Sequence, residues 1–296
     1  MDPFVKRIQD LIQEDVLEMR SVHGGSVSEA YRIRTPSGTF FVKHNSEHIG
    51  QALFDAEVLG LKKMAATKTV VTPNLLLHHK DLLIIDWVDT GRQTAVFWEN
   101  FGRTLAELHK APQSHFGFES NNFIGRAQQV NTPMISAKKP RAWFEFFKDY
   151  RLKHQLGLAK KDLSFPENLA NAIEVIIRDL DGFLGGVEEE PPALIHGDLW
   201  SGNYLADRNG QAVLLDPSCS YSHREMEFGM LKLFGNCAKP FYDAYHSTYP
   251  LQDGWERRVQ VYKLYHLLNH FNLFGASYLS SIGGVLRELD LLSTRA

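Results

Sequence analysis

Three polar residues in the second half of the sequence have the types and the spacing that phosphoryl transfer requires. Asp198 lies in the segment His-Gly-Asp-Leu-Trp-Ser-Gly-Asn, which ends at Asn203, and a further aspartate, Asp216, follows. A carboxylate at the first position can accept the proton of an attacking hydroxyl group. An amide and a carboxylate at the other two positions can hold a metal ion beside a nucleotide phosphate. The set therefore predicts phosphoryl transfer with Asp198 as the general base.

The segment between Asn203 and Asp216 is predicted to be a β-hairpin. Asn209-Gly210 is typical of a two-residue type I′ turn, in which both central residues have positive φ. With that turn Asn203 faces Asp216, and directly opposed side chains lie about 5 Å apart on one face of a sheet. Amide and carboxylate oxygens suit Mg²⁺, so we expect these two residues to bind one magnesium ion. The alternative is that Asp198 and Asn203 form side-chain turns and Asp216 caps a strand.

The first part of the chain supplies a cation for the phosphates of a nucleotide. Lys43 ends a predicted strand, and Glu57 shares a helical stripe with the apolar residues Leu53, Leu61 and Met64. The stripe buries the Glu57 carboxylate, which then needs a cationic partner. We predict that Lys43 is this partner and that it reaches the α- and β-phosphates, as in the lysine-glutamate pair of protein kinases.

Two further segments could bind the rest of a nucleotide. Gly24 and Gly25 are expected to form a loop whose backbone N–H groups approach phosphate oxygens, or simply a turn. No G-x-x-x-x-G-K-[ST] motif occurs, which disfavours a P-loop NTPase. Asp86, Trp87 and Val88 close a predicted strand and are expected to form a hinge that holds adenine through backbone groups. For Trp87, packing is an equally good interpretation.

The predicted secondary structure divides the chain into two lobes. Residues 1–90 form a small N-terminal nucleotide-binding lobe with an antiparallel sheet and one long helix, and residues 91–296 form a mainly helical lobe with the catalytic loop, metal site and acceptor site. The fold class is therefore α+β, with a two-lobed, protein-kinase-like arrangement. Helices are expected over residues 4–18, 47–66, 97–108, 140–160, 167–184 and 225–290. Strands are expected over residues 31–35, 39–43, 70–78, 82–88, 193–196, 204–206 and 212–215, and an ordered loop over 111–140.

The composition excludes several classes of protein. The chain has 296 residues, 44% of them hydrophobic, which is enough for a large core and excludes a disordered chain. With 32 Lys+Arg and 35 Asp+Glu the net charge is -3, which disfavours nucleic acid as a partner. Two cysteines and no long apolar run predict a cytoplasmic protein without disulfides or a membrane partner. The oligomeric state is not determined, and a monomer is the default.

The sequence resembles a known family, the fructosamine kinases or ketosamine-3-kinases, within the wider protein-kinase-like and aminoglycoside-phosphotransferase fold. The resemblance runs nearly end to end, and its most specific features are Leu199-Trp200-Ser201-Gly202 and the later His223-Arg224-Glu225. It implies ATP and Mg²⁺ as cofactors and a small-molecule or protein-bound ketosamine as substrate. Phosphorylation of the 3-hydroxyl group then leads to decomposition of the product and release of the amine.

The resemblance also implies roles for single residues. Asp198 would be the base, Asn203 and Asp216 the magnesium ligands, Lys43 the phosphate contact and Glu57 the residue that orients it. The alternatives are another small-molecule kinase of the same fold, acting on an aminoglycoside, choline or a sugar, and a nucleotide-binding pseudokinase.

Two further segments are given no catalytic role. Residues 223–225 either support the metal loop through salt bridges or contact substrate. The histidines and aromatic residues between 262 and 274 are expected to pack in the core.

Overall fold

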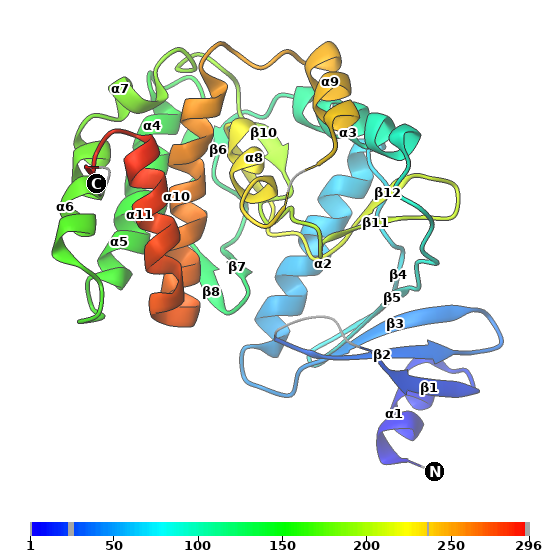
Figure 1. Ribbon diagram of the computed structural model, residues 1–296. Coiled ribbons are helices and arrows are strands. Elements are labelled where there is room, and N and C mark those ends of the chain that lie inside the picture. Colours follow the sequence, from blue (N-terminus) through cyan, green and yellow to red (C-terminus); the bar gives the residue numbers. More distant parts are fainter. Residues whose placement is uncertain (1, 23–26, 236, 294–296) are drawn as a thin grey trace.

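An antiparallel sheet of five strands forms the N-terminal part of the protein (Figure 1). The computed structural model describes residues 2–22, 27–235 and 237–293, so the predicted glycine loop at Gly24 and Gly25 lies outside the described residues. The strand order is β1-β2-β3-β5-β4. The strands are β1 (Glu18–Ser21), β2 (Glu29–Arg34), β3 (Thr39–His44), β4 (Leu75–His79) and β5 (Leu82–Asp86). The predicted hairpin is confirmed, because β2 pairs with β3 and Tyr31 lies opposite Val42.

Two helices accompany this sheet. The first, α1 (Pro3–Ile12), begins at Asp2, whose carboxylate accepts a hydrogen bond from the N–H of Phe4. It ends at Gln13, which has a φ of 58°. The prediction of a helix to residue 18 is therefore wrong, since the chain leaves the helix at Gln13 and then joins the sheet as β1. The second, α2 (Gly50–Thr67), was predicted, and it extends from the sheet towards the helical part (Figure 1).

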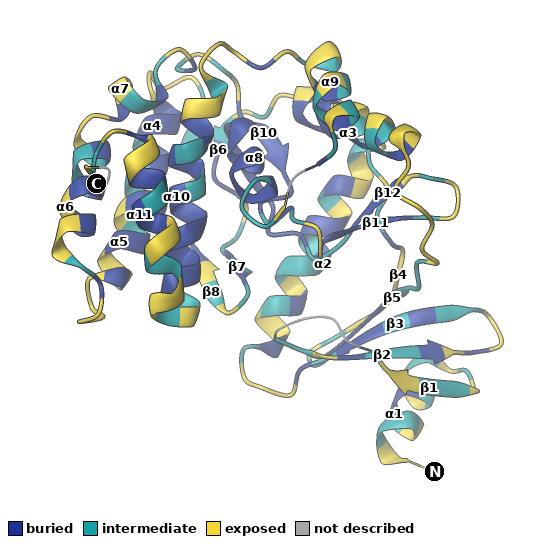
Figure 2. Ribbon diagram, in the orientation of Figure 1, coloured by how far each residue is buried: buried dark blue, intermediate teal, exposed yellow. Residues whose placement is uncertain are grey.

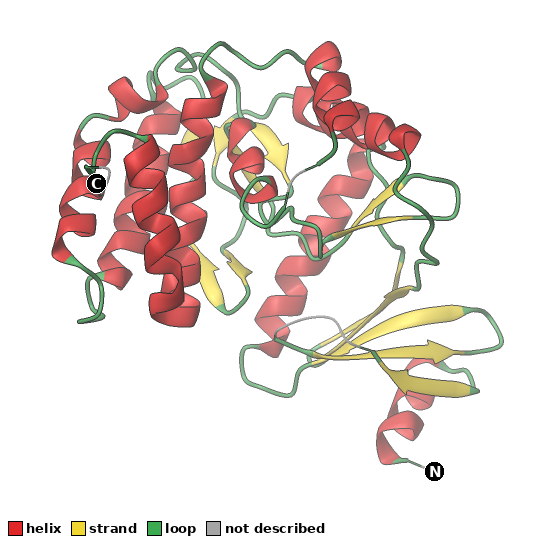
Figure 3. Ribbon diagram, viewed as in Figure 1, coloured by secondary structure: helices red, strands yellow, loops and turns green. Residues whose placement is uncertain are grey.

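The chain after β5 is mainly helical, as predicted (Figure 3). Its helices are α3 (Ala95–Lys110), α4 (Ala142–Phe147), the π-helix η1 (Lys148–Leu152), α5 (Lys153–Ala159), α6 (Glu167–Arg178), α7 (Leu180–Leu184), α8 (Glu225–Leu231), α9 (Lys239–Thr248), α10 (Trp255–Phe274), the 3₁₀ helix η2 (Gly275–Tyr278) and α11 (Leu279–Glu288). Helix α10 packs against α8, α5 and α11 and is largely buried (Figure 2). In the described part of the chain, no helix has the length and apolar character needed to cross a membrane.

Short strand pairs lie among these helices. They are β6 (His115–Phe116) with β9 (Ile135–Ser136), β7 (Asn122–Ile124) with β8 (Ala127–Gln129), β10 (Ala193–Ile195) with β13 (Ser220–Ser222), and β11 (Tyr204–Ala206) with β12 (Ala212–Leu214). The segment 111–140 therefore contains two strand pairs that the sequence did not predict. Side-chain amides hold this segment in place. The side-chain N–H of Asn122 donates to the carbonyl oxygen of Cys219 over 2.7 Å, and the side-chain oxygen of Asn122 accepts from the side-chain N–H of Asn131 over 2.9 Å.

One buried apolar cluster connects the N-terminal helix α2 to the region after β10. Phe54 and Val58 of α2 belong to it, together with Leu199 and Tyr204. All four side chains are at most 5% exposed. Because protein interiors are close-packed, this cluster fixes α2 relative to the loop that carries Asp198.

Candidate active site

Asp198 lies in the loop between β10 and β11, beside the fully buried Leu199. The pKa of its carboxyl group is raised to about 8, because burial, with a contribution from the nearby Glu227 carboxylate, outweighs the lowering effect of the hydrogen bond from Asn203. Oδ1 of Asp198 is buried and makes no hydrogen bond within the described part of the chain. When this carboxyl group is ionised, Oδ1 is free to accept a proton from a bound hydroxyl group.

Asn203 is buried and turns its side-chain N–H towards Asp198. Nδ2 donates to the backbone carbonyl oxygen of Asp198 over 2.8 Å and to its Oδ2 over 3.1 Å. Since the nitrogen of a side-chain amide donates and its oxygen accepts, Oδ1 of Asn203 is still available to another partner. The structure thus brings Asp198 and Asn203 together.

Glu227 anchors the backbone just before Asp198, and the sequence prediction missed it. Its fully buried carboxylate accepts hydrogen bonds from the N–H of His196 over 2.5 Å and from the N–H of Gly197 over 3.0 Å. Gly197 has a φ of 83°, and a Cβ there would lie 2.1 Å from the carbonyl oxygen of Ser218, so only glycine fits. The sequence did indicate that Glu227 is buried, because it lies between the apolar residues Met226 and Phe228.

The register of the β11–β12 hairpin differs from the prediction by one residue. Tyr204 pairs with Leu214, and the N–H of Leu215 donates to the carbonyl of Asn203 over 2.9 Å, so Asn203 faces Leu215 and not Asp216. The predicted two-residue turn is wrong because of Asp207. Its carboxylate accepts from the backbone N–H groups of residues 209 and 211, over 2.8 Å and 2.7 Å, which stabilises a wider turn.

Asp216 still reaches the site, by a route that the hairpin register did not predict. Its φ of 50° lies in the left-handed region, so the chain leaves the direction of β12 at this residue. The carboxylate contacts Nζ of Lys43. Immediately after it, Pro217 packs so closely on α2 that a Cβ at Gly60 would lie 2.9 Å from its Cγ.

The predicted pair of Lys43 and Glu57 is present. Nζ of Lys43 donates to Oε1 of Glu57 over 2.8 Å and to Oε2 over 2.9 Å. The side chains are 11% and 12% exposed, so the pair is shielded from water. Lys43 therefore contacts carboxylates from both parts of the chain, Glu57 of α2 and Asp216 of the loop after β12.

The predicted hinge at Asp86, Trp87 and Val88 is the connection that leaves β5. The N–H of Asp86 donates to the carbonyl of Asn74 over 3.0 Å, and the N–H of Trp87 donates to the carbonyl of Thr39 over 3.1 Å. Both donors are thus already engaged inside the protein. Within the described residues, the N–H of Val88 is the hinge donor that makes no hydrogen bond.

The Trp87 side chain packs on the sheet, in line with the second interpretation offered for it. Its ring lies 6.3 Å from the ring of Phe41, and the guanidinium carbon of Arg32 lies 5.3 Å from the ring centroid. A hollow of about 310 Å³ lies behind the hinge, between residues 71–74, 86–89 and the turn at 207–209.

Residues 223–225 are buried in ion pairs and support the fold behind the site. Glu225 forms two 2.7 Å hydrogen bonds to Arg258, and Arg224 donates to Glu190 over 2.7 Å. His223 also contacts Glu190. Because all three side chains are at most 1% exposed, the salt-bridge interpretation is the one that the structure supports.

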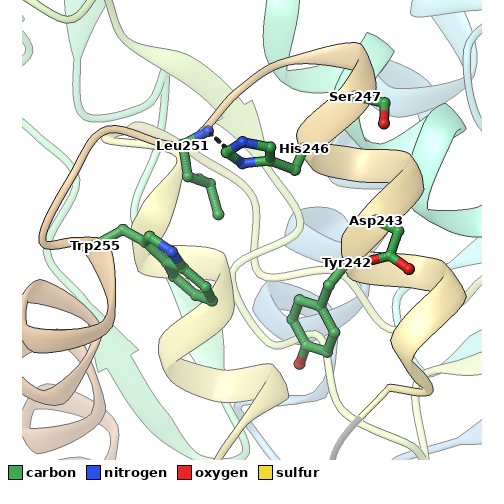
Figure 4. A pocket seen from close by; sticks show the side chains of 6 residues that line it. All are labelled: Tyr242, Asp243, His246, Ser247, Leu251 and Trp255. Carbon is green, nitrogen blue, oxygen red and sulfur yellow. Dashed lines mark hydrogen bonds between the residues drawn. The ribbon is translucent and has the colours of Figure 1, made fainter.

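A second hollow, of about 440 Å³, lies outside this site. It is lined by residues of α9 and the start of α10: Tyr242, Asp243, His246, Ser247, Leu251 and Trp255 (Figure 4). None of the residues predicted to do chemistry lines it.

A buried lysine-glutamate pair on the sheet side and an Asp-Asn-Asp set on the helical side define a phosphotransferase of the protein-kinase-like fold. The comparisons give the family: the model described as fructosamine kinase matches residues 4–292, and the chain belongs to this family.

The relatives cover almost the whole chain. A probable ketoamine kinase of Synechocystis is 37% identical over 92% of this chain and 90% of its own, and the chloroplastic protein-ribulosamine 3-kinase of Arabidopsis thaliana is 39% identical over 92% and 82%. The crystal structure of a Thermobifida fusca protein assigned to the fructosamine-3-kinases has a TM-score of 0.86, with 30% identity over 97% of this chain and 98% of that one. The ADP-bound aminoglycoside phosphotransferase APH(2'')-Ib shares the fold, with a TM-score of 0.66 and 14% identity over 97% of each chain.

Proposed function

We propose that this protein transfers the γ-phosphoryl group of ATP to the 3-hydroxyl group of a ketosamine, with Asp198 as the general base. The observation that carries the proposal is the buried, unpartnered Oδ1 of Asp198, in a side chain whose other oxygen accepts a hydrogen bond from Asn203. The family membership supplies the substrate class. The relatives named as ribulosamine 3-kinases support ribulose adducts as well as fructose adducts.

The chain's own groups divide the chemistry between the two sides of the site. Oδ1 of Asp198 accepts the proton of the 3-hydroxyl group while the hydroxyl oxygen forms a bond to the γ-phosphorus of ATP. The bond between the γ-phosphorus and the oxygen that bridges it to the β-phosphorus breaks, and ADP is released. Lys43, held by Glu57, contacts the α- and β-phosphates and balances their charge. The N–H of Val88 is available to the adenine base.

Asn203 and Asp216 fit a magnesium ion by the chemistry of their donors. In the described part of the chain, no group of three or more His, Cys, Asp or Glu side chains could hold a metal ion by itself. Mg²⁺ in kinases is held by one or two protein oxygens together with waters and substrate phosphates. The amide oxygen of Asn203 and the carboxylate of Asp216 supply such a pair, and the ion would neutralise charge on the phosphate oxygens.

The proposal also includes the predicted lobe boundary and the predicted cellular location. The lobe boundary near residue 90 is supported by the change from sheet to helices after β5. A reducing, cytoplasmic location is supported by Cys219 and Cys237, which are both buried free thiols.

The test is ATP turnover with Mg²⁺ and fructose-lysine, ribulose-lysine, an aminoglycoside, choline or no acceptor. Ketosamine-dependent turnover is expected, and Asp198→Asn should lower kcat by about 10²- to 10⁴-fold. The matched control is Asp243→Asn, an exposed aspartate of α9 paired with Lys239, which should keep full activity. Turnover only with an acceptor other than a ketosamine would contradict the substrate class. The absence of turnover with every acceptor would favour the pseudokinase.

A further inference from the structure

The β7–β8 hairpin carries an ion pair that joins the two parts of the protein. The hairpin lies beside α2 (Figure 1), and its tip is the turn at Gly125 and Arg126. The Arg126 guanidinium donates from Nη2 to Oε1 of Glu47 over 2.7 Å and from Nη1 to Oε2. This bidentate geometry fixes an arginine and a carboxylate relative to each other. Because Glu47 lies between β3 and α2, the pair connects the helical part to the sheet part.

The strand β7 of this hairpin is attached to the loop after β12, which carries Asp216. The hydroxyl group of Ser218 donates to the carbonyl oxygen of Phe123, and the side-chain N–H of Asn122 donates to the carbonyl oxygen of Cys219 over 2.7 Å. Ser218 and Cys219 follow Asp216 by two and three residues. A movement of the hairpin is therefore passed on to the proposed metal ligand.

Glu47 is attached in a similar way to the strand that carries Lys43. The N–H of Glu47 donates to Oδ1 of Asn45 over 3.0 Å, and Nδ2 of Asn45 donates to the carbonyl oxygen of Val27 over 3.0 Å. Asn45 is buried and follows Lys43 by two residues, just after β3. The ion pair thus links the strand of the proposed phosphate contact to the loop of Asp216.

The pair of Arg126 and Glu47 is suited to set a spacing, and it is not needed to hold the fold together. Its side chains are 47% and 51% exposed, and exposed ion pairs contribute little to stability. The buried apolar cluster that joins α2 to the region after β10 holds the two parts together instead. Lys43 and Asp216 contact each other where these parts meet. Loss of the ion pair should therefore alter the spacing at these two residues and leave the fold intact.

We propose that Arg126 and Glu47 are positioning residues, whose ion pair sets the distance between Lys43 and the loop of Asp216 and so holds both sides of the site against the phosphates of the nucleotide. The inference rests on the proposed function. Both residues act through Lys43 and Asp216 and not by contact with the substrate. Because both charges are exposed, salt weakens their attraction, which makes the binding of the phosphates sensitive to ionic strength through this pair.

The experiment reverses each charge of the pair and then both charges together. Glu47→Arg and Arg126→Glu place like charges opposite each other, and each should weaken ADP binding about fivefold and lower kcat about tenfold. The double variant exchanges the two charges and should restore both quantities to within about twofold of the wild type. Adenosine binding should stay unchanged in every variant, because adenosine has no phosphate. Calorimetric titration measures binding, and steady-state kinetics measure kcat.

The matched control is Lys153→Glu. It reverses one charge of an exposed ion pair with Asp149 that lies within the helical part, and it should change neither ADP binding nor kcat. Ionic strength gives a second readout with the neutral variant Arg126→Gln. At about 50 mM NaCl this variant should bind ADP about threefold more weakly than the wild type, and the difference should be clearly smaller at about 1 M, where salt screens exposed charges.

The outcomes separate this inference from the function on which it rests. If the double variant binds ADP as weakly as the single variants, or if the single variants bind ADP normally, the ion pair does not position the site and the inference is wrong. It is also wrong if adenosine binding weakens together with ADP binding, because the whole site is then disturbed. If ADP binding follows the expected pattern but the wild type phosphorylates no ketosamine, the proposed function fails and the positioning of the phosphates by this pair is supported.

Discussion

Asn203 donates its side-chain N–H to Oδ2 of Asp198 over 3.1 Å. The same group reaches the backbone carbonyl of Asp198 over 2.8 Å, so a single amide fixes both the side chain and the main chain of the proposed base. Because Oδ2 already accepts this hydrogen bond and Oδ1 accepts none in the described part of the chain, we expect Oδ1 to accept the hydroxyl proton. The amide oxygen of Asn203 is the proposed metal ligand, so this residue couples the position of the base to the position of the phosphates.

Asn203→Ala should therefore impair two functions at once. We expect kcat to fall by about 10²- to 10³-fold, the size seen when one preorganised polar contact is removed from an active site. The Mg²⁺ concentration that gives half-maximal rate should rise, which loss of orientation alone would not cause. Asn209→Ala, in the exposed turn of the same hairpin, is the matched control. An unchanged rate and Mg²⁺ requirement in Asn203→Ala would remove this residue from the site.

The β11–β12 hairpin shows which features of the site could be predicted from the sequence and which could not. Alternating apolar residues and the Asn209-Gly210 pair were enough to predict β11, β12 and a turn. They were not enough to predict the register, because Asp207 bonds the turn N–H groups and makes it one residue wider. The meeting of Asp216 with Lys43 depends instead on the left-handed backbone at Asp216 and on close packing against Gly60. Neither feature has a local sequence pattern.

The two buried glutamates differ in what the sequence reveals. Glu57 was predictable because a carboxylate on an apolar helical stripe needs a cation, and Lys43 was at hand in the neighbouring strand. Glu227 also lies among apolar residues, but its main partners are the backbone N–H groups of residues 196 and 197. Every residue except proline carries such a donor, so the sequence could indicate burial of Glu227 but could not indicate its partner.

Glu227→Gln tests the anchoring of the catalytic loop. The amide keeps the size of the side chain, but one of its two polar atoms becomes a donor that faces a backbone donor. Loss of a hydrogen bond to a charged group in the interior should lower the free energy of unfolding by about 2 kcal/mol. We expect kcat to fall about tenfold or more, with little change in KM for ATP, since the nucleotide contacts lie elsewhere. Urea unfolding and steady-state kinetics measure the two effects.

A purely structural role for Glu227 would lower stability and leave kcat unchanged at temperatures where the variant is folded. The matched control is Glu225→Gln in the same helix, whose carboxylate pairs with Arg258 and not with the loop. It should lose stability to a similar degree and keep a near-normal kcat. Equal losses of kcat in both variants would contradict the assigned role of Glu227.

Glu57→Gln tests the pair that orients Lys43. Without the Glu57 charge, Lys43 keeps only the Asp216 carboxylate as an ionic partner and is drawn towards it, away from the nucleotide phosphates. We expect KM for ATP to rise about tenfold, which corresponds to roughly 1.4 kcal/mol. The KM for the ketosamine should change little. Asp55→Asn is the control in the same helix, because that aspartate is half exposed and pairs with His78. A rise of KM for both substrates in Glu57→Gln would indicate general disorder of α2 instead.

We predict that the free energy of unfolding depends on pH through Glu190. Burial raises the pKa of this carboxyl group, but the hydrogen bonds and charges of His223 and Arg224 outweigh burial and lower the pKa to about 2, from 4.5. Between these values the folded state binds fewer protons than the unfolded chain, so the free energy of unfolding falls as the pH falls. Above pH 4.5 the contribution is complete, and it is lost as the pH falls towards 2.

Glu190→Gln should therefore lower the free energy of unfolding at pH 7 by about 3 kcal/mol, because it leaves Arg224 buried without its anion. At pH 3 the difference from the wild type should be clearly smaller, since the unfolded wild type is then protonated at this residue and stabilised relative to the native state. Urea unfolding at pH 7, 4.5 and 3 measures this change. Glu174→Gln removes a more exposed carboxylate, paired with Lys160, and should cost less than about 1 kcal/mol at every pH. If the deficit of Glu190→Gln were the same at pH 3 as at pH 7, the ionised carboxylate would not be the source of the stability, and packing of the side chain would explain it instead.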